Sequence, residues 1–413
     1  MHVAFVVSTF PAVSHTFIDS QIRGLVQLGH RVSIHAFARP APGLTHSYWS
    51  DLEEPLEVHY GVYQPKIRWR RLAKALLEFP LFIGHAGMWL RGLLNAPHHP
   101  FAGRLEPLYW SIPLLPALDA DVWVCHFGDV ALRALAVTHL AGTQRGRRHR
   151  LAAFFHGADI TRFVDEHGTA VYRQLLAETD VCLPISARWQ HRLLELGAAP
   201  ERINLHRMGV DCARFAFLPR ALPDQGPLVL LSVARLVEKK GLEYAIRAIN
   251  LVPAPLRQRI RYLIAGDGPL LTDLQMLISE ENLETQVILL GWQDQAQIVE
   301  QVKAAHLMLV PSVTARDGDQ EGIPVSAMEA MATGLPVIAT RHSGIPELVR
   351  DRENGRLADE RDAAGLARAI SETLASTADY ARYATAARSL VETDFNEARL
   401  NLALERKLQR LLA

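Results

Sequence analysis

Cysteine is scarce in this sequence, and so are long apolar runs. The three cysteines among the 413 residues, Cys125, Cys182 and Cys212, are too few and too far apart for a disulfide framework or a metal site, and this usage is typical of a reduced, cytosolic protein. The stretch 79–90 is interrupted by proline and glycine and is shorter than a membrane span of about 20 residues. We therefore expect no membrane span. No basic region precedes the apolar residues 1–7, so we interpret them as a first strand rather than a signal peptide.

The sequence also lacks net charge and the common metal and dinucleotide motifs. It has 44 Lys and Arg against 44 Asp and Glu, and residues 1–215 hold 22 of the basic and 18 of the acidic ones. This excess is too small to indicate a nucleic-acid binder. The 18 histidines show no His-Glu-x-x-His spacing. No Gly-x-Gly-x-x-Gly follows the first expected strand, which argues against a dinucleotide-dependent oxidoreductase.

Short apolar runs alternate with helical patterns, and this alternation predicts an α/β fold of parallel sheets covered by helices. The expected strands are 3–7, 31–36, 122–125, 151–155, 181–184, 203–206, 228–233, 262–265, 287–290, 307–310 and 336–339. Since 413 residues exceed one ordinary core, we expect two domains. They should comprise residues 1–215 and 228–385, with a proline-rich linker at 216–227 and a helical segment, 386–413, that could pack on either domain.

The most informative segment has two glutamates around a helix start. Glu321 lies in a loop, and Glu329 lies in a helix predicted over 324–333. Gly322 permits a close approach of the backbone to a ligand, and Pro324 suits the first helical position.

The chemistry of this segment suits a polyol joined to a phosphate, as in a nucleotide-sugar. Free amides at a helix start face an anion, and a carboxylate accepts hydrogen bonds from neighbouring hydroxyls. The expected strand 307–310 ends just before the loop, at the edge where open parallel sheets bind ligands. The alternative is a solvated helix start with surface carboxylates, because the spacing of Glu321 and Glu329 alone is a weak signal.

A basic turn follows the expected strand 228–233. Arg235 offers a planar fork of donors and Lys240 a compact charge, and together they suit a diphosphate leaving group. A merely solvated turn is the alternative, and we interpret Lys239 in that way.

Glycine-rich turns follow the next two expected strands. Gly266 and Gly268 come after 262–265, and Gly291 comes after 287–290. Their backbone could approach a nucleotide closely. A structural turn has the same signature, and the spacing is incomplete as a nucleotide motif.

Polar residues of the first half follow expected strands in the same way. His156 and His126 each come directly after a strand, and Ser14 is a candidate N-cap after the first one. We expect them to line a ligand-binding cleft together with Asp159. A core histidine bonded to backbone is the alternative for His156.

The pair Asp317 and Asp319 has a spacing found in metal-dependent enzymes that bind diphosphates. We interpret it as no metal site, because Arg235 and Lys240 already supply positive charge and the pair lies on a polar loop. We therefore expect neither a metal nor another cofactor.

The segment 66–90 is first basic and then apolar and aromatic, a pattern that favours contact with an anionic membrane surface. Residues 60–160 hold 12 basic against 6 acidic residues, so positive charge is concentrated around it. An ordinary amphipathic helix that packs on the first domain remains the alternative.

Taken together, the motifs resemble those of the retaining glycosyltransferases of family 4 over nearly the whole chain. They are closest to the exopolysaccharide branch, which includes colanic acid biosynthesis glycosyltransferases. The motifs occur at 10–17 (FPAVSHTF), 126–128 (HFG), 155–160 (FHGADI), 183–186 (LPIS), 207–211 (RMGVD), 234–241 (ARLVEKKG) and 317–325 (DGDQEGIPV). The turn 9–14 departs from the Gly-Gly loop of many relatives.

The resemblance implies the GT-B fold, in which two Rossmann-like domains face a cleft. The N-terminal domain would bind the acceptor and the C-terminal one the nucleotide-sugar. Glu321 would contact the donor sugar, and His156 would lie beside it. Arg235 and Lys240 would contact the diphosphate, and Glu329 the ribose. The other implied donor contacts are Gly322, Ile323, Pro324, Gly266, Gly268 and Gly291. On the acceptor side, the implied residues are Ser14, His126 and Asp159.

The implied reaction moves a hexose from a nucleoside-diphosphate sugar to a lipid-linked oligosaccharide, with retention of the anomeric configuration. The enzyme would be cytoplasmic, at the inner face of the membrane. Two alternatives stay open: a sugar-nucleotide epimerase of the same fold, and a non-catalytic scaffold of polysaccharide assembly.

Overall fold

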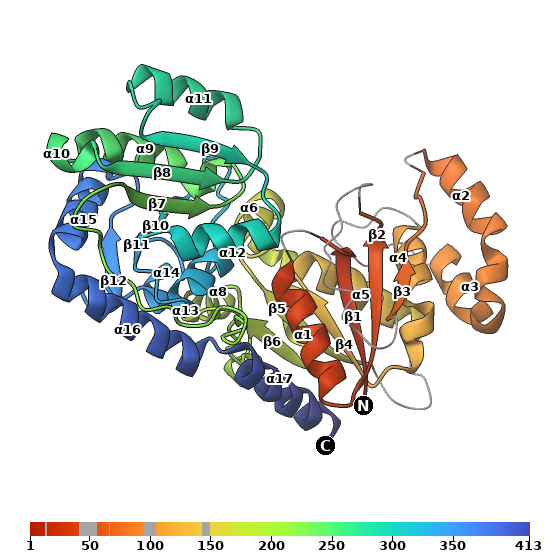
Figure 1. Cartoon of the computed structure of the whole chain (residues 1–413). Coiled ribbons are helices and arrows are strands. Elements are labelled where there is room, and N and C mark those ends of the chain that lie inside the picture. Colours follow the sequence, from red (N-terminus) through yellow and green to blue (C-terminus); the bar gives the residue numbers. More distant parts are fainter. Residues whose placement is uncertain (13–14, 41–55, 66, 95–104, 143–148) are drawn as a thin grey trace. The chain divides into compact units, whose positions relative to one another are not determined.

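The computed structural model describes residues 1–12, 15–40, 56–65, 67–94, 105–142 and 149–413. The chain forms two compact units (Figure 1). The first consists of Met1–Ile185, Trp189–His206 and Asn401–Ala413, and the second of Ser186–Arg188 and Arg207–Leu400. The first unit thus ends before residue 215, and the last helix of the chain belongs to it as well. No helix in the described ranges is long and apolar enough to span a membrane.

The first unit is built on a parallel sheet with the strand order β3-β2-β1-β4-β5-β6. Residues 3–7 of β1 are completely buried, as expected for a strand with both faces covered. The strands are β1 (His2–Thr9), β2 (Arg31–Ala38), β3 (Glu57–Tyr60), β4 (Val122–His126), β5 (Arg150–Phe155) and β6 (Val181–Pro184). The helices are α1 (Thr16–Gln27), α2 (Arg68–Leu77), α3 (Ala86–Leu94), α4 (Glu106–Leu114), α5 (Gly128–Ala141), α6 (Arg162–His167), α7 (Arg173–Glu178), α8 (Ala187–Glu195) and α17 (Glu397–Leu412).

The second unit repeats this plan with the parallel strand order β12-β11-β10-β7-β8-β9. Its strands are β7 (Leu228–Val233), β8 (Ile260–Ala265), β9 (Val287–Gly291), β10 (Leu307–Val310), β11 (Val337–Thr340) and β12 (Gly355–Ala358). Its helices are α9 (Leu242–Leu251), α10 (Ala254–Arg257), α11 (Leu271–Glu280), α12 (Gln295–Ala304), α13 (Val325–Ala332), α14 (Ile345–Leu348), α15 (Ala363–Ala375) and α16 (Thr377–Asp394).

The predicted α/β fold with two parallel sheets is confirmed, and the differences lie at the sheet edges. Strands β3 and β12 were not predicted. Strand β3 is only four residues long and partly exposed, and β12, although largely buried, has the sequence Gly-Arg-Leu-Ala, which contains no apolar run. The expected strand 203–206 forms only one isolated bridge, between Cys182 and Ile203. Expectation and structure agree best for the central strands, where burial on both faces requires apolar residues throughout.

The segment 216–227 contains no helix or strand, as expected of a connection. It is nevertheless fastened to the second unit. The guanidinium of Arg220 donates hydrogen bonds of 2.7–2.9 Å to the carbonyls of Val302, Lys303 and Ala305. These carbonyls belong to the last turn of α12, where a cation also suits the helix dipole.

The C-terminal helix α17 lies beside α1, from the opposite end of the chain (Figure 1). The Asn401 side chain donates to the carbonyl of Ser20 at 3.2 Å. A Cβ on Gly24 would lie 2.0 Å from Asn401 Nδ2, so the helices can approach this closely only at a glycine. Leu404 and Leu408 are completely buried, which places the last helix in the core of the first unit.

We predict that Leu404→Ala lowers the free energy of unfolding by about 2–4 kcal/mol, because it leaves a cavity in this core. The matched control is Leu402→Ala in the same helix, where the side chain is 41% exposed. Urea unfolding of both variants would measure the difference. Equal stability of the two variants would show that the helix is not docked in this way.

Candidate active site

The residues expected at the donor site follow the strands of the second sheet at one edge. Strands β7 and β10 are neighbours, but β8 lies on one side of this pair and β11 on the other. The strand order therefore reverses between β7 and β10, and open α/β sheets bind ligands at such a switch point. The turn after β7 carries Lys240, and the loop after β10 carries Glu321.

Lys240 and Glu321 form an ion pair across this switch point. Their side chains are 17% and 15% exposed. Burial alone would raise the pKa of Glu321, but the charges of Lys240 and Lys239 and the hydrogen bond from Lys240 outweigh burial and lower the pKa to about 2. Glu321 is therefore ionised at any physiological pH, and it is a weak proton acceptor.

Lys239 makes a second ion pair beside the first, so its interpretation as a solvated residue is wrong. Its Nζ lies 3.1 Å from Asp319 Oδ1, and the two side chains are only 11% and 15% exposed. The Lys239 carbonyl also accepts the N–H of Val313 at 2.9 Å. Together these contacts join the basic turn to the loop. Within the described ranges, no group of three or more His, Cys, Asp or Glu is arranged to hold a metal ion.

Arg235 lies in the same turn as Lys240 but is solvent-exposed. Among the residues that the structure describes, none forms a hydrogen bond or ion pair with its guanidinium. The turn then closes at Gly241, which has a φ of 59° and whose Cβ, if present, would lie 2.0 Å from the Pro311 carbonyl oxygen. Glycine is thus required for Lys240 to reach the loop after β10.

The two glycine turns are packed against the basic turn. A Cβ on Gly266 would lie 1.8 Å from the Ala234 oxygen, and one on Gly268 would lie 2.6 Å from the Leu236 oxygen. The Gly266 N–H donates to the Gly291 carbonyl at 2.8 Å. The contact that these glycines permit is therefore with neighbouring backbone, and it brings the three turns together.

Helix α13 begins one residue later than predicted, so Pro324 is its N-cap and not its first helical residue. Gly322 and Ile323 are buried just before it. Pro324, Ser326 and Lys240 line a small cavity of about 10 Å³, roughly the space of one water molecule. The helix start and the basic turn thus border the same space.

Glu329 lies in α13 and is partly buried. Burial raises the pKa of Glu329 to about 7, against the opposing charge of Arg214. Its carboxyl group therefore changes charge near neutral pH, unlike that of Glu321.

In the first unit, the structure brings His126 and His156 together. His126 Nδ1 lies 3.1 Å from His156 Nε2, and both rings are buried. Burial, with a smaller effect of His15, lowers the pKa of His156 to about 3, so the ring is neutral. The partner of His156 is thus a second histidine and not a backbone group. Ser14, expected on the same side, lies outside the described residues.

Asp159 is buried between the turns after β4 and β5. Its carboxylate accepts the N–H groups of Gly128 at 2.9 Å, His156 at 3.0 Å and Gly157 at 2.8 Å. Burial raises the pKa of Asp159 to about 6, although these N–H groups favour the ionised form. The carboxylate thus fixes the two turns that carry the histidines.

Comparison with known proteins shows the family of this chain. The chain is 36% identical to the putative colanic acid biosynthesis glycosyltransferase WcaL of Salmonella typhimurium, over 99% of this chain and 100% of that protein. It is 35% identical to the amylovoran biosynthesis glycosyltransferase AmsK of Erwinia amylovora over the full length of both. Residues 216–390 match the family described as glycosyl transferases group 1. The chain belongs to this glycosyltransferase family.

Solved structures confirm the GT-B fold of this glycosyltransferase. Anabaena HepE, in a crystal structure with UDP and glucose, superimposes with a TM-score of 0.73 at 18% identity, over 99% of this chain and 100% of HepE. WaaG, a glycosyltransferase involved in lipopolysaccharide biosynthesis, gives a TM-score of 0.65 at 15% identity, over 100% and 99% of the two chains.

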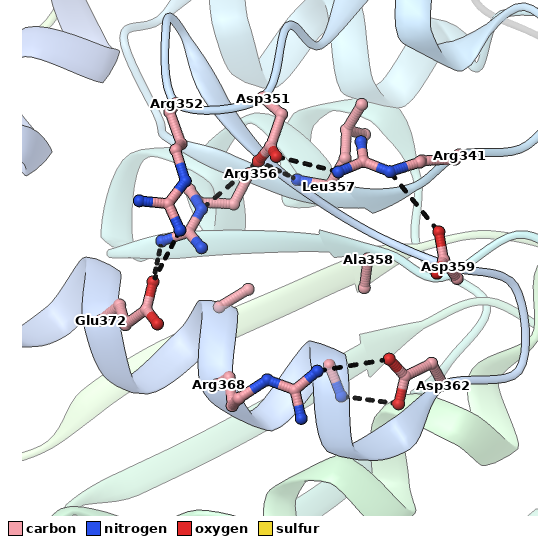
Figure 2. Close-up of a pocket in the computed structure, with 12 residues that line it drawn as sticks. Arg341, Asp351, Arg352, Arg356, Leu357, Ala358, Asp359, Asp362, Arg368 and Glu372 are labelled. Carbon is pink, nitrogen blue, oxygen red and sulfur yellow. Dashed lines mark hydrogen bonds and ion pairs between the residues drawn. The ribbon is translucent and has the colours of Figure 1, made fainter.

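A larger cavity of the glycosyltransferase, about 250 Å³, lies beside β12 and α15. Figure 2 shows that its arginines point toward carboxylates of the same cavity. The ion pairs join Arg341 to Asp351 and Asp359, Arg352 and Arg356 to Glu372, Arg356 to Asp351, and Arg368 to Asp362. The four arginines are balanced by four carboxylates, and the cavity lies beside the edge strand β12, away from the switch point between β7 and β10.

His342 and Glu360 were missed at the sequence level, although both contact the loop after β10 that carries Glu321. His342 comes shortly after β11, and its Nε2 accepts the backbone N–H of Glu321 at 2.9 Å. The signal that could have found it is the one used for His156, a histidine after a buried strand. Glu360 follows an edge strand that was not predicted, so it had no such signal.

The raised pKa of Glu329 predicts a pH-dependent gain in stability for Glu329→Gln. Between about pH 4 and about pH 7, the folded glycosyltransferase holds a proton that the unfolded chain has released, so wild-type stability falls as pH rises. Glutamine has no such charge to bury. The Tm advantage of the variant should therefore grow by roughly 2–4 °C across this range, measured by differential scanning fluorimetry. Glu300→Gln, at a side chain 71% exposed, is the control, and an advantage that does not grow with pH would contradict the prediction.

Proposed function

We propose that this glycosyltransferase moves a hexose from a nucleoside-diphosphate sugar to a lipid-linked oligosaccharide in exopolysaccharide synthesis. The observation that carries the proposal is the ion pair of Lys240 and Glu321 at the switch point of the second sheet. It presents a cation for phosphate and a carboxylate for sugar hydroxyls side by side. The names of WcaL and AmsK support the pathway, and the HepE complexes with UDP, glucose and UDP-glucose support the donor class.

We propose a front-face reaction with retention, as in family 4. The low pKa of Glu321, about 2, makes its carboxylate a poor base, so it is suited to holding the sugar and not to removing the acceptor proton. The departing phosphate would take that proton. Lys240 and the exposed Arg235 would stabilise its growing negative charge, which is where electrostatic catalysis acts. Glu329 would bind the ribose, and His156, a neutral ring, would offer a hydrogen bond to the reacting sugar.

We also propose that transfer needs no divalent metal or other cofactor. The ammonium groups of Lys239 and Lys240 already supply positive charge beside Asp319 and Glu321. The activity assay should therefore be run with and without EDTA, and a reversible loss of activity would contradict this part of the proposal. The anomeric configuration of the product, read by NMR, tests retention.

Incubation with labelled nucleotide-sugars separates the alternatives. A 2-epimer that appears without acceptor would identify an epimerase. Failure of the purified protein to bind any nucleotide-sugar by calorimetry would support a scaffold. Acceptor-dependent consumption of a labelled donor is the expected result.

The sharpest test of the proposed site is Glu321→Gln, which keeps the shape of the side chain but removes its charge. We predict that transfer falls at least about 100-fold, because both the sugar contact and the partner of Lys240 are lost. The melting temperature should also fall, because Lys240 loses its partner charge, so turnover is compared at a temperature at which both proteins stay folded. Arg316→Ala, at a side chain 94% exposed in the same loop, is the control. Near-normal turnover of Glu321→Gln would refute the role of Glu321.

We further propose that the first unit contacts an anionic membrane. Ten of the 19 exposed large apolar side chains in the described ranges lie between Tyr63 and Leu90, which is far more than scattered surface residues require. Helix α2 buries Ala75 but leaves Trp69 and Leu76 exposed by 67% and 52%. One face of the helix thus packs on the first unit, and the other presents apolar side chains to solvent, which supports a membrane contact. The guanidinium of Arg70 lies over the Trp69 ring, 5.3 Å from its centre, where it can meet lipid phosphates.

We predict that the protein floats with phosphatidylglycerol-containing liposomes at low salt and less at high salt. The double variant Trp69→Ser/Leu76→Ser should lose most of this binding, because it removes the exposed apolar face. Leu251→Ser, at a side chain 57% exposed in the second unit, is the control and should bind like wild type. Absence of flotation at low salt would leave α2 with a packing role only.

A further inference from the structure

The backbone of Glu321 is held by a buried histidine. Its N–H donates to His342 Nε2 at 2.9 Å, and His342 Nδ1 lies 2.6 Å from Glu360 Oε1. The His342 ring is completely buried. Its two nitrogens thus connect a residue of the proposed donor site with a carboxylate on the far side of the ring.

The hydrogen bonds fix the tautomer of His342. A backbone N–H can only donate, so Nε2 must accept and carries no proton. The proton of the neutral ring is then on Nδ1, where it donates to Glu360. Burial lowers the pKa of His342, although Glu360 and Glu321 oppose this effect and Arg188 adds to it. The neutral ring is the form that the geometry requires.

Glu360 also holds the other end of the same loop. It accepts the N–H of Thr314 at 2.8 Å through Oε2. Thr314 lies just after β10, and Glu321 lies just before α13. The turn after His342 packs closely on the same segment, since a Cβ on Gly344 would lie 2.9 Å from Ile323 Cγ1. Two side chains therefore bind the beginning and the end of the loop that carries Glu321.

We propose that His342, oriented by Glu360, is a positioning residue that sets where the Glu321 carboxylate lies. Lys240 holds that carboxylate from one side, and His342 holds its backbone from the other. This inference rests on the proposed role of Glu321 at the donor sugar. A displacement of about 1 Å at a reacting centre can cost about 100-fold in rate, so the effect of losing His342 should be seen in kcat.

A pair of substitutions separates positioning from packing. In His342→Gln, the amide oxygen reaches the place of Nε2 and can still accept the Glu321 N–H. In His342→Asn, the side chain is shorter, and its oxygen cannot reach the place of Nε2. We expect His342→Gln to keep kcat within about 10-fold of wild type and His342→Asn to lose about 100-fold. Both variants lose the same ring, so equal kcat values for them would overturn the proposal.

The matched control is His306→Gln. His306 Nδ1 also accepts a backbone N–H, that of Val229 at 3.0 Å, and an Asn oxygen would keep the place of Nδ1 whereas a Gln oxygen would not. His306 comes directly before β10, at the amino ends of the strands and away from the site. We expect a change in Tm without a loss of kcat. A loss of kcat as large as that of His342→Asn would show a general effect of stability.

Two further readouts do not depend on packing. Protonation of His342 would place an N–H at Nε2 against the Glu321 N–H, so wild-type kcat should fall as pH drops below the ordinary histidine range, and His342→Gln should lack this decrease. Hydrogen–deuterium exchange of peptides spanning 313–323 should be faster in His342→Asn than in wild type. An unchanged exchange rate would overturn the proposal.

The assay is run with UDP-glucose, UDP-galactose and GDP-mannose. If wild type uses none of them, the proposed function loses its support, but the exchange experiment still tests the link between His342 and the loop. If wild type is active and His342→Asn is as active, only the positioning role fails.

Discussion

Two adjacent ion pairs determine the shape of the proposed donor site of this glycosyltransferase. Lys239 pairs with Asp319, and Lys240 pairs with Glu321, so consecutive residues of one turn hold alternate residues of one loop. Buried charges of this kind are stable only when each has its partner. The turn after β7 and the loop after β10 must therefore fold against each other, and the position of Glu321 depends on both.

Backbone N–H groups complete this arrangement in both units. In the second unit, Glu360 and His342 accept N–H groups from the two ends of the loop. In the first unit, the Asp159 carboxylate accepts those of the two turns that carry His126 and His156. Buried acceptors that satisfy loop amides hold irregular backbone in one conformation. Asp159 in the first unit, and His342 with Glu360 in the second, thus fix the backbone next to polar residues that are candidates for the active site.

Helix α2 differs from these loops because it presents apolar side chains to solvent. Soluble proteins usually turn the apolar stripe of a helix inward, whereas here the small residue Ala75 faces inward and Trp69 faces outward. Ala75 belongs to a cluster with Phe82, Leu105, Leu108 and Tyr109. The exposed face of α2 has no such cluster among the described residues, and it is the face of the proposed membrane contact.

The sequence by itself determined the α/β fold, the central strands and the place of Glu321, Lys240 and Arg235 after the carboxyl ends of β10 and β7. Parallel strands need apolar runs, and polar residues follow their carboxyl ends. Local pattern did not reveal the edge strands β3 and β12, which lack an apolar run, or the ion pair of Lys239. Only the tertiary structure decided that His342 contacts Glu321 and that the last helix joins the first unit. Such contacts join residues that are far apart along the chain, and no spacing in the sequence records which of them meet.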